Sequence, residues 1–228
     1  VAKSFYKKID GYICLNDNQI ELLKNIGFDS RKIFKKYNFV PDTELFTSDD
    51  NAHNFPKRFV VYYGRIGEEK GIYILMKVWE KLKDIPLVVM GGGPLEEEFK
   101  KWVHQQKQVY YLGYTPHEKC LSIVKNAEFV LFPSIWYEGC SMVQIEAESQ
   151  GKALIATDLG FSTESIRNGY KVKLGDIDGF VKTIKMMWKD PDKCKKMGEN
   201  ARKDYLEKYL PENNYHQLMN IYKKILKV

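Results

Sequence analysis

Residues 58–94, RFVVYYGRIGEEKGIYILMKVWEKLKDIPLVVMGGGP, are the stretch that decides the fold of this chain. A short run of β-branched and aromatic residues ends at Gly64, a segment of helical length follows, and a second apolar run ends at Gly91. Strand, helix and strand of these lengths form a βαβ unit, whose two strands pair in parallel because the crossover returns the chain to the same edge. We therefore expect a parallel sheet with right-handed crossovers.

The same alternation continues toward the C-terminus. Apolar runs of strand length occupy residues 58–64, 86–91, 109–113, 128–133 and 152–157, with a weaker one at 170–174. Helical periodicity marks residues 71–82, 94–106, 116–126 and 141–150 between them, and then residues 177–188, 192–209 and 211–226. This pattern predicts an α/β fold: a Rossmann-like, doubly wound, mostly parallel sheet of about six strands, with extra C-terminal helices.

The first 57 residues follow a different pattern. Residues 10–15 are expected to form a strand, Asn16 to cap a short helix over residues 19–26, and Gly27 to close it. Residues 33–40 are expected to be extended, and 41–56 are polar and irregular. We expect residues 1–40 to be the end of a preceding domain, 41–57 a linker, 58–210 one domain and 211–228 a C-terminal helix. Since the chain starts with Val rather than Met, we expect an excised fragment.

The composition limits the classes of protein to which this chain can belong. The 228 residues include 36 basic and 30 acidic side chains, a net charge of +6, and 44% are hydrophobic, which is enough for a folded core. No apolar run approaches the roughly 20 residues of a membrane span. Four cysteines without a C-x-x-C pair favour reduced thiols in the cytoplasm over a zinc or disulfide framework. Basic clusters are interleaved with apolar residues, so no nucleic-acid partner is expected.

The loop after the first strand, GRIGEEKG at residues 64–71, is rich in glycine and basic residues. Arg65 offers a guanidinium for bidentate contact, and Lys70 a point charge at the start of the next helix, a combination that suits a phosphate group. The alternative is that both cations are surface charges paired with Glu68 and Glu69. A second loop, GGGP at residues 91–94, is expected to be a tight turn close to a ligand, with Pro94 at the first helical position.

Residues 133–147, PSIWYEGCSMVQIEA, are the most informative stretch for function. An acidic loop leads into a helix that Ser141 or a neighbour is expected to cap, and the free amides of residues 139–142 would form a nest for an anion or hydroxyl. Glu138 and Glu146 would lie about 12 Å apart along a helix, more than the roughly 5–9.5 Å of glycosidase carboxylate pairs. Two carboxylates serving different hydroxyls of one long ligand fit better. The alternative is a loop Glu and a helix-face Glu without such a role.

Taken together, these motifs resemble a known family. The series G-R-x4-K-G, G-G-G-P, Leu112-Gly113, P-S-x-x-Y-E-G and E-x7-E, in this order and spacing, is similar to the C-terminal half of retaining glycosyltransferases with the GT-B fold, of the glycosyl transferases group 1 type. The resemblance covers residue 58 to the C-terminus, and residues 10–41 resemble the end of the acceptor-side N-terminal domain. It implies that the chain is one half of a GT-B fold and the donor-binding domain of a hexosyltransferase in polysaccharide, glycolipid or cell-envelope synthesis.

The resemblance also implies residue roles. Arg65 and Lys70, after Gly64, would bind the diphosphate of a UDP-, GDP- or ADP-linked sugar, which is a donor substrate and not a tightly bound cofactor. Glu138 would contact hydroxyls of the transferred sugar, and Glu146 the ribose. The remaining expected contacts are made by Gly139, Cys140, Ser141 and Met142 with sugar and phosphate, and by Tyr114 and Thr115 with the nucleobase. Glu138, Arg65 and Lys70 would be the catalytic residues.

No metal is expected. Asp176 and Asp178, and Asp190 and Asp192, match the D-x-D pattern with which the GT-A glycosyltransferase fold holds a cation. Both pairs precede helical stretches, so we favour their being helix caps. No histidine lies in a ligand cluster.

Two departures from the family pattern qualify the expected activity. Gly139-Cys140-Ser141 stands where Gly-Phe-Pro or Gly-Phe-Gly is common, and the acceptor-binding N-terminal domain is expected to be missing. The fragment alone is then expected to bind a donor but to be inactive in transfer to a sugar or lipid-linked acceptor. Alternatives are a non-catalytic nucleotide-sugar-binding subunit and a GT-B-fold epimerase or phosphorylase. A cytoplasmic location is expected, with peripheral contact at the inner face of the membrane as a further expectation.

Overall fold

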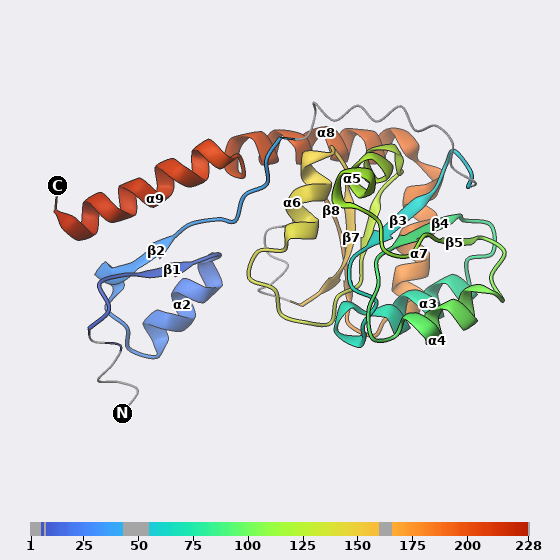
Figure 1. Cartoon of the computed structure of the whole chain (residues 1–228), viewed down its shortest axis with the longest axis horizontal. Coiled ribbons are helices and arrows are strands. Elements are labelled where there is room, and N and C mark those ends of the chain that lie inside the picture. The colour runs from blue at the N-terminus through green and yellow to red at the C-terminus, as the bar shows by residue number, and fades with distance from the viewer. Residues whose placement is uncertain (1–5, 7, 43–54, 160–165, 228) are drawn as a thin grey trace.

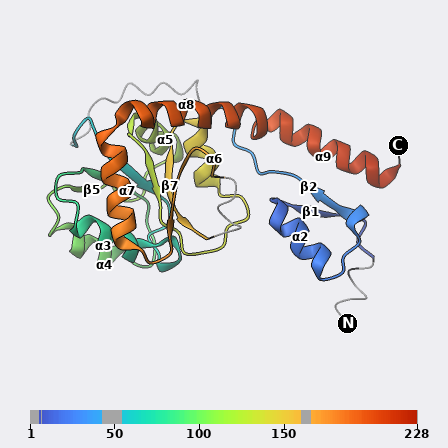
Figure 2. The ribbon, with the colours of Figure 1, turned by 180° about the vertical axis from the view of Figure 1, so that it is seen from behind.

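The structure is a computed structural model that describes residues 6, 8–42, 55–159 and 166–227. A six-stranded sheet with its helices forms the larger part of the molecule, and a small segment from the N-terminus forms the other (Figure 1). Helix α9 (Pro211–Leu226) runs from the larger part along the smaller one, as the view from behind also shows (Figure 2). The linker expected at residues 41–57 falls mostly on residues 43–54, outside the described residues.

The large sheet confirms the predicted fold class. Its strands are β3 (Val60–Tyr63), β4 (Leu87–Met90), β5 (Val109–Tyr111), β6 (Val130–Phe132), β7 (Leu154–Asp158) and β8 (Gly169–Lys173). Each neighbouring pair is parallel, and the order is β5-β4-β3-β6-β7-β8. The chain therefore winds outward from β3 in one direction and then outward from β6 in the other. In such a doubly wound sheet, ligands bind beyond the carboxyl ends of the strands at this reversal, β3 and β6.

Helices cover both faces of the sheet because its strands alternate apolar side chains between the two faces. Val60 and Tyr62 pack into one buried cluster, with α3 (Ile72–Glu80), α4 (Glu96–Val103) and α7 (Ile177–Lys189). Val61 and Tyr63 pack into the other, with α5 (His117–Asn126) and α6 (Met142–Ser149). Helix α8 (Pro191–Lys208) packs against α6 and α7.

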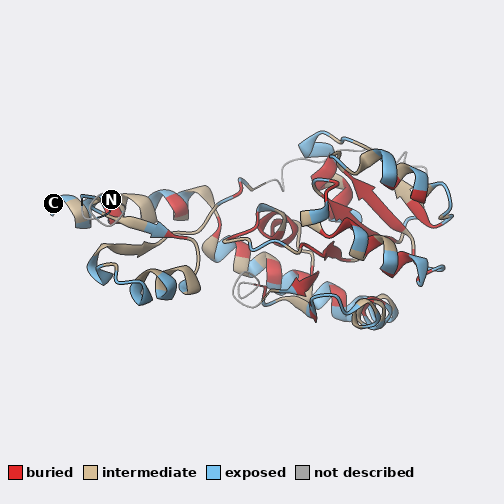
Figure 3. Cartoon of the chain, turned by 90° about the horizontal axis from the view of Figure 1, so that it is seen from below, coloured by how far each residue is buried: buried red, intermediate tan, exposed pale blue. Residues whose placement is uncertain are grey.

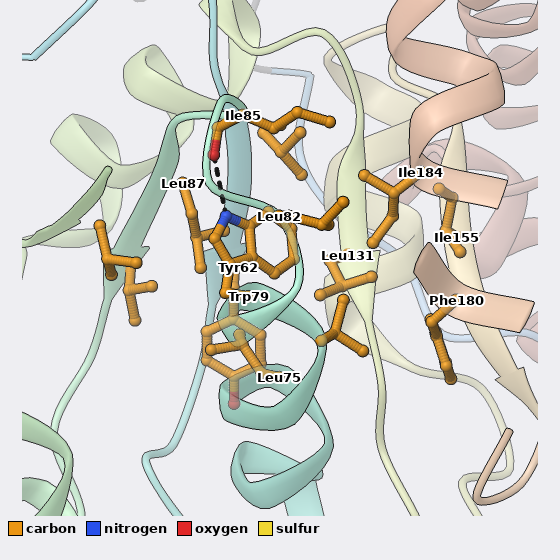
Figure 4. Close-up of a cluster of buried hydrophobic side chains, with 14 of the residues drawn as sticks. Tyr62, Leu75, Trp79, Leu82, Ile85, Leu87, Leu131, Ile155, Phe180 and Ile184 are labelled. Carbon is orange, nitrogen blue, oxygen red and sulfur yellow. Dashed lines mark hydrogen bonds between the residues drawn. The ribbon is translucent and has the colours of Figure 1, made fainter. Parts of the chain in front are cut away.

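Trp79 lies at the centre of the first cluster. Its side chain is fully buried, and its indole Nε1 donates a hydrogen bond to the carbonyl of Ile85 at 3.0 Å, so the one polar atom of the ring is satisfied (Figure 4). Burial coloured over the ribbon is concentrated in the strands and the inward sides of the helices (Figure 3). This rigid core holds the strand ends, and with them the loops that follow, in fixed positions.

Two predicted helix starts differ from the structure. Residues 68–70 form a separate 3-10 turn, η2 (Glu68–Lys70), and α3 begins only at Ile72. The reason is Gly71, whose φ of 75° is left-handed and interrupts the helical path. Lys70 therefore lies on a turn before the helix rather than at its start. Pro94 likewise belongs to the turn before α4 and does not occupy the first helical position.

The N-terminal segment is a small β-α-β unit. Strands β1 (Tyr12–Cys14) and β2 (Ile33–Lys35) pair in parallel, with α2 (Asp17–Asn25) and the short η1 (Ser30–Lys32) between them. The predicted cap is confirmed, since Oδ1 of Asn16 accepts a hydrogen bond from the backbone of Gln19 at 2.8 Å. Only three of the residues predicted to be extended at 33–40 form a strand. Residues of α9 reach this segment, because Asn214 donates to the carbonyl of Tyr37 at 2.6 Å.

None of the helices in the described ranges is both long and apolar enough to cross a bilayer.

Candidate functional site

The loops after β3 and β4 are fastened to each other by their backbones. Gly64 donates to the carbonyl of Met90 at 3.0 Å, and Ile66 donates to the carbonyl of Gly92 at 2.9 Å. A Cβ atom on Gly91 would lie 1.9 Å from the carbonyl oxygen of Gly64, so only glycine permits this approach. The glycine-rich turn after β4 thus supports the loop that carries Arg65 and Lys70.

A second close approach joins the loop after β3 to the loop after β6. A Cβ atom on Gly71 would lie 1.9 Å from the carbonyl oxygen of Pro133. The carbonyl of Glu69 accepts hydrogen bonds from the backbone of Ile135 at 3.0 Å and from the hydroxyl of Ser134 at 3.2 Å. These contacts join the loops at the reversal point of the sheet, where a ligand is expected.

Lys70 and Glu138 meet across this junction. Nζ of Lys70 lies 2.5 Å from Oε1 of Glu138, and the two side chains are 31% and 18% exposed. The hydroxyl of Ser134 lies 3.3 Å from the same carboxylate oxygen, so its single proton is shared between this oxygen and the carbonyl of Glu69. The alternative in which Lys70 pairs with Glu68 or Glu69 is therefore wrong: its partner stands on the loop of another strand.

Arg65 stands on the same loop as Lys70 but is far more open. Its side chain is 64% exposed, and Nε lies 3.6 Å from Oε1 of Glu69, a loose pair at the surface. The expected alternative of a surface pairing with Glu69 is thus correct for Arg65. Such a pair contributes little stability, so the guanidinium is free to turn toward an anion.

The start of α6 follows Glu138 directly. Ser141 is the N-cap residue by backbone position, but its side chain makes no capping hydrogen bond. Residues 139–142 precede or begin the helix, so their N–H groups have no carbonyl one turn earlier to bond. They provide the anion-favouring end of the helix. Burial raises the pKa of the Cys140 thiol, which keeps it protonated and disfavours a role as nucleophile.

Glu146 is buried on α6 and faces the segment that follows β5. Its Oε1 lies 2.9 Å from Nε2 of His117, the first residue of α5. Tyr114 and Thr115 stand a few residues before His117, where Tyr114 is 85% exposed and Thr115 partly buried. The His117 contact therefore brings the carboxylate next to the segment expected to border a nucleobase.

The first Asp of each D-x-D pair is a helix cap, as predicted, and the second lies in the first turn of the helix. Asp176 accepts from the backbone of Gly179 at 2.8 Å, and Asp190 accepts from the backbone of Lys193 at 3.0 Å. Within the described part of the chain, no group of three or more His, Cys, Asp or Glu side chains is placed to hold a metal ion.

Three features therefore lie together in one candidate site. They are the basic loop after β3, the Lys70–Glu138 ion pair and the start of α6. A sequence model of the family "Glycosyl transferases group 1" matches residues 45–204, more than half of the chain. The chain belongs to the glycosyl transferases group 1 family.

Curated relatives in this family carry varied transferase names. O-antigen chain mannosyltransferase C of Escherichia coli is 25% identical over 175 residues, which are 74% of this chain and 47% of that protein. The 2-deoxystreptamine N-acetyl-D-glucosaminyltransferase of Niallia circulans is 25% identical over 228 residues, covering 92% of this chain and 58% of that protein. The chain thus spans about half the length of the curated relatives it matches.

Solved glycosyltransferase structures share the fold. A glycosyltransferase from Rickettsia africae superposes with a TM-score of 0.83 at 20% identity, covering 99% of this chain and 67% of that one. HepE of Anabaena, solved in complex with UDP, superposes with a TM-score of 0.80 at 18% identity, covering 96% of this chain and 64% of that one. At these identities the likeness shows the fold, and the GT-B arrangement expected from the motifs is confirmed.

Sequence reasoning missed residues of the N-terminal segment that reach this candidate site. Nδ2 of Asn16 donates to the carbonyl of Gly139 at 2.7 Å, and Nδ2 of Asn38 donates to the carbonyl of Cys140 at 2.9 Å. A Cβ atom on Gly139 would lie 2.6 Å from Nε2 of Gln19. The sequence marks Asn16 only as a helix cap, because a contact between residues 123 apart has no local signal.

Ser134 and His117 were also missed. The hydroxyl of Ser134 touches Glu138, and the imidazole of His117 touches Glu146. Ser134 lies inside the quoted P-S-x-x-Y-E-G motif, so the motif offered a signal for it. His117 could have been flagged only as a polar residue at the start of the helix next to the expected nucleobase segment.

Proposed function

We propose that this chain is the donor side of a retaining glycosyltransferase. It binds a nucleoside diphosphate sugar without a metal, and the sugar passes to an acceptor hydroxyl in polysaccharide, glycolipid or cell-envelope synthesis. The observation that carries the proposal is the Lys70–Glu138 pair of 2.5 Å, which joins the loops after β3 and β6. Ligands bind at this reversal in doubly wound sheets, and the pair supplies one group for phosphate and one for hydroxyls.

Arg65 and Lys70 hold the diphosphate in this proposal. Both stand on the loop after β3, where Arg65 is free to swing and Lys70 is fixed by its partner. The start of α6 adds free backbone N–H groups at residues 139–142. When the bond to the sugar breaks, negative charge grows on the departing diphosphate. Cations and helix amides placed there beforehand stabilise that charge more than the ground state, which is how they lower the barrier.

Glu138 then serves the transferred sugar and Glu146 the ribose. Glu138 is 18% exposed and so reaches the site edge, whereas Glu146 is more deeply buried and set toward the segment after β5. A carboxylate accepts two hydroxyl hydrogen bonds, the bidentate contact that a vicinal diol offers. Tyr114 and Thr115 would border the base, with the Tyr114 ring available for stacking.

Transfer itself is proposed to need a second, acceptor-binding domain. The chain spans about half the length of the relatives it matches, so donor binding without efficient transfer is expected of it alone. We further propose a cytoplasmic location, with peripheral contact at the inner face of the membrane. What supports a reducing compartment is that Cys14, Cys120, Cys140 and Cys194 are all free and buried.

Calorimetry tests the proposal. UDP, GDP and ADP, and then their sugar conjugates, are titrated into this chain and into its Arg65→Ala variant. One nucleoside diphosphate should bind, and its affinity should fall at least about tenfold in the variant, about 1.4 kcal/mol. HepE of Anabaena was solved with UDP, so UDP is the first to try.

Arg31→Ala is the matched control for this titration. Arg31 is likewise an exposed arginine beside a carboxylate, that of Asp29, but it stands on η1 in the N-terminal segment. Its substitution should leave nucleotide affinity unchanged. Equal weakening by both substitutions would mean that general charge, not a site at Arg65, attracts the nucleotide. Binding of no nucleotide would contradict the proposal for this chain.

A further inference from the structure

A basic cavity lies at the edge of the large sheet where β6 and β7 begin. Its volume is about 650 Å³, within the roughly 300–1,000 Å³ of small-molecule sites. Residues 125–128, before β6, and residues 149–152, before β7, form part of its lining. The loops that carry Lys70 and Glu138 instead follow the ends of β3 and β6. Because these strands run parallel, the cavity and the candidate donor site lie at opposite edges of the sheet.

One wall of the cavity is a single face of α8, the helix along the top of Figure 1. The lining residues of this helix recur every three or four positions and therefore share one side; they are Pro191, Cys194, Lys195, Glu199, Arg202 and Lys203. The helix rests on the turn after α6, since a Cβ atom on Gly198 would lie 2.0 Å from the carbonyl oxygen of Gly151. This close backbone contact fixes the spacing of the two walls.

Lys152 lines the cavity from the segment before β7 and is partly buried. Within the described ranges, its ammonium group has neither a hydrogen bond nor an ion pair. Burial lowers the pKa of this group, Glu128 opposes the shift, and the charge of Lys125 adds to it. A partly buried cation without a partner is unfavourable, and an anion in the cavity would compensate it.

The other charges of the lining leave a surplus of cations. The carboxylate of Glu128 is already neutralised by Arg58, with 2.7 Å between Oε1 and Nε. Arg202 is likewise taken up by Asp42, at 2.8 Å. Among the described lining residues, the charged side chains without an ion pair are Lys125, Lys152, Lys195, Lys203 and Glu199. Four ammonium groups thus face one carboxylate, so the cavity favours an anion over a neutral or cationic ligand.

We propose that this cavity binds a phosphate group, at a site separate from the donor diphosphate. A phosphate monoester carries roughly two negative charges at neutral pH and strong acceptor oxygens. Several lysines suit it, because each ammonium is a compact charge with three donors. The inference does not rest on the proposed function, since Arg65, Lys70 and Glu138 lie outside the lining. A free phosphate compound and a lipid headgroup share this chemistry.

Amide NMR on this chain, with pyrophosphate as the probe, tests the inference. Amides of residues 125–128 and 149–152 should shift and saturate, and should do so equally in Arg65→Ala, which alters only the donor site. Lys152→Met removes the charge and keeps an unbranched side chain, and it should weaken binding at these amides at least about tenfold. Lys195→Ala, at an exposed position of α8, should weaken it about threefold without disturbing the fold.

Lys196→Ala is the matched control. Lys196 is also an exposed lysine of α8, next to Lys195 in the sequence, but it lies outside the cavity lining. Its substitution should leave pyrophosphate binding at the cavity unchanged. Equal weakening by Lys195→Ala and Lys196→Ala would overturn the inference, because it would report overall charge only. Shifts confined to residues 64–71 and 139–142 would also overturn it, since they would place pyrophosphate in the donor site alone.

Sedimentation with lipid vesicles distinguishes the two sources of phosphate. Binding to phosphatidic acid vesicles that Lys152→Met weakens and Lys196→Ala does not would assign the phosphate to a lipid headgroup. Pyrophosphate binding without vesicle binding would assign it to a free phosphate compound. Binding of neither probe at the cavity overturns the inference and leaves the donor site standing. Pyrophosphate bound at the cavity of a chain that binds no nucleotide contradicts the proposed function only.

Discussion

Lys70 and Glu138 form an ion pair, so a ligand that binds either side chain must compete with the other member of the pair. An incoming diphosphate and the Glu138 carboxylate compete for one ammonium group, because Nζ of Lys70 already lies 2.5 Å from Oε1. The Glu138 side chain also receives the Ser134 hydroxyl at 3.3 Å, so it has a second partner when Lys70 turns away. The pair thus keeps both groups in position and lets the phosphate displace one of them.

A substitution at Glu138 should show this competition. Glu138→Gln removes the carboxylate charge and leaves Lys70 less neutralised, so binding of the nucleoside diphosphate should tighten about threefold to tenfold. Lys70→Ala should weaken the same binding at least about tenfold. Calorimetry with the nucleotide that binds the unaltered chain measures both. Weaker nucleotide binding in Glu138→Gln would contradict competition between the Glu138 carboxylate and the diphosphate for Lys70.

Gly71 carries a second prediction at the residue scale. Gly71→Ala should lower the free energy of unfolding by at least about 2 kcal/mol, because its φ is 75° and a Cβ would meet the Pro133 carbonyl at 1.9 Å. Gly113→Ala is the control, since Gly113 also has a positive φ, 67°, but nothing lies within 4 Å of its Cβ position. Urea unfolding of both variants checks the difference. Equal losses of unfolding free energy in Gly71→Ala and Gly113→Ala would mean that the close approach to the Pro133 carbonyl adds no destabilisation.

Helix α6 is the element on which most of the site depends. Its start follows Glu138, and Glu146 faces the segment after β5. Two residues later Glu148 points toward the interface with the N-terminal segment, in a small cavity that Asn16 and Gly139 also line. Residues two apart on a helix face nearly opposite sides, so one helix serves both the donor side and this interface.

The buried carboxyl of Glu148 should make the free energy of unfolding depend on pH. Burial raises the pKa of its carboxyl to about 7, and Asp204 adds to the rise, while the hydrogen bond from Gln144 and the charges of Lys208 and Arg167 oppose it. The folded chain then holds this proton more tightly than the unfolded chain. Its stability should therefore be higher below the usual glutamate pKa and fall as the pH rises toward about 7.

Glu148→Gln should remove this dependence. The variant should be more stable than the unaltered chain at about pH 8, by an amount on the order of 3 kcal/mol, with the difference vanishing near pH 4 to 5. Glu118→Gln, at an exposed position on α5, is the control. Urea unfolding across this pH range measures the effect. A difference that did not change with pH would contradict ionisation of Glu148 as its cause.

At the scale of the whole molecule, the two parts differ in how deeply they are packed. All four residues of β3 are buried, as are all three of β6, whereas none of the residues of α2 is buried. The N-terminal segment is held to the rest by side-chain hydrogen bonds such as Asn16 to Gly139, and by a small apolar cluster in which Val40 packs with Tyr205 and Tyr209. Helix α2 contributes no buried apolar side chain to this cluster, so its free energy of local opening is expected to be low.

Hydrogen exchange should reveal this difference. Backbone amides of α2 should exchange on the order of a hundredfold faster than those of β3 and β6, because α2 opens without opening the core. Asn16→Ala, which removes the helix cap and the bond to Gly139, should speed exchange in α2 further and leave β3 unchanged. Equal protection of α2 and β3 in the unaltered chain would show that the two parts open as one unit.

The sequence alone was sufficient for the strands of the large sheet and for most of its helices, whereas the site residues it indicated stay a prediction. Apolar runs marked all six strands of the large sheet, helical periodicity marked the helices, and Asp176 and Asp190 were recognised as caps. These features are local: side-chain alternation, capping and chain reversal act over a few residues. The family motifs likewise predicted which loops carry Arg65, Lys70 and Glu138.

Only the tertiary structure decided which of these groups meet. Lys70 pairs with Glu138, 68 residues away, rather than with its neighbours Glu68 and Glu69, and Asn16 bonds Gly139 across 123 residues. The physical reason is the strand order, which sets β3 beside β6 and so brings their following loops together. Periodicity indicates which face of a strand or helix a residue occupies. The pairing of strands depends instead on how the whole core packs, and that packing involves residues far apart in the sequence.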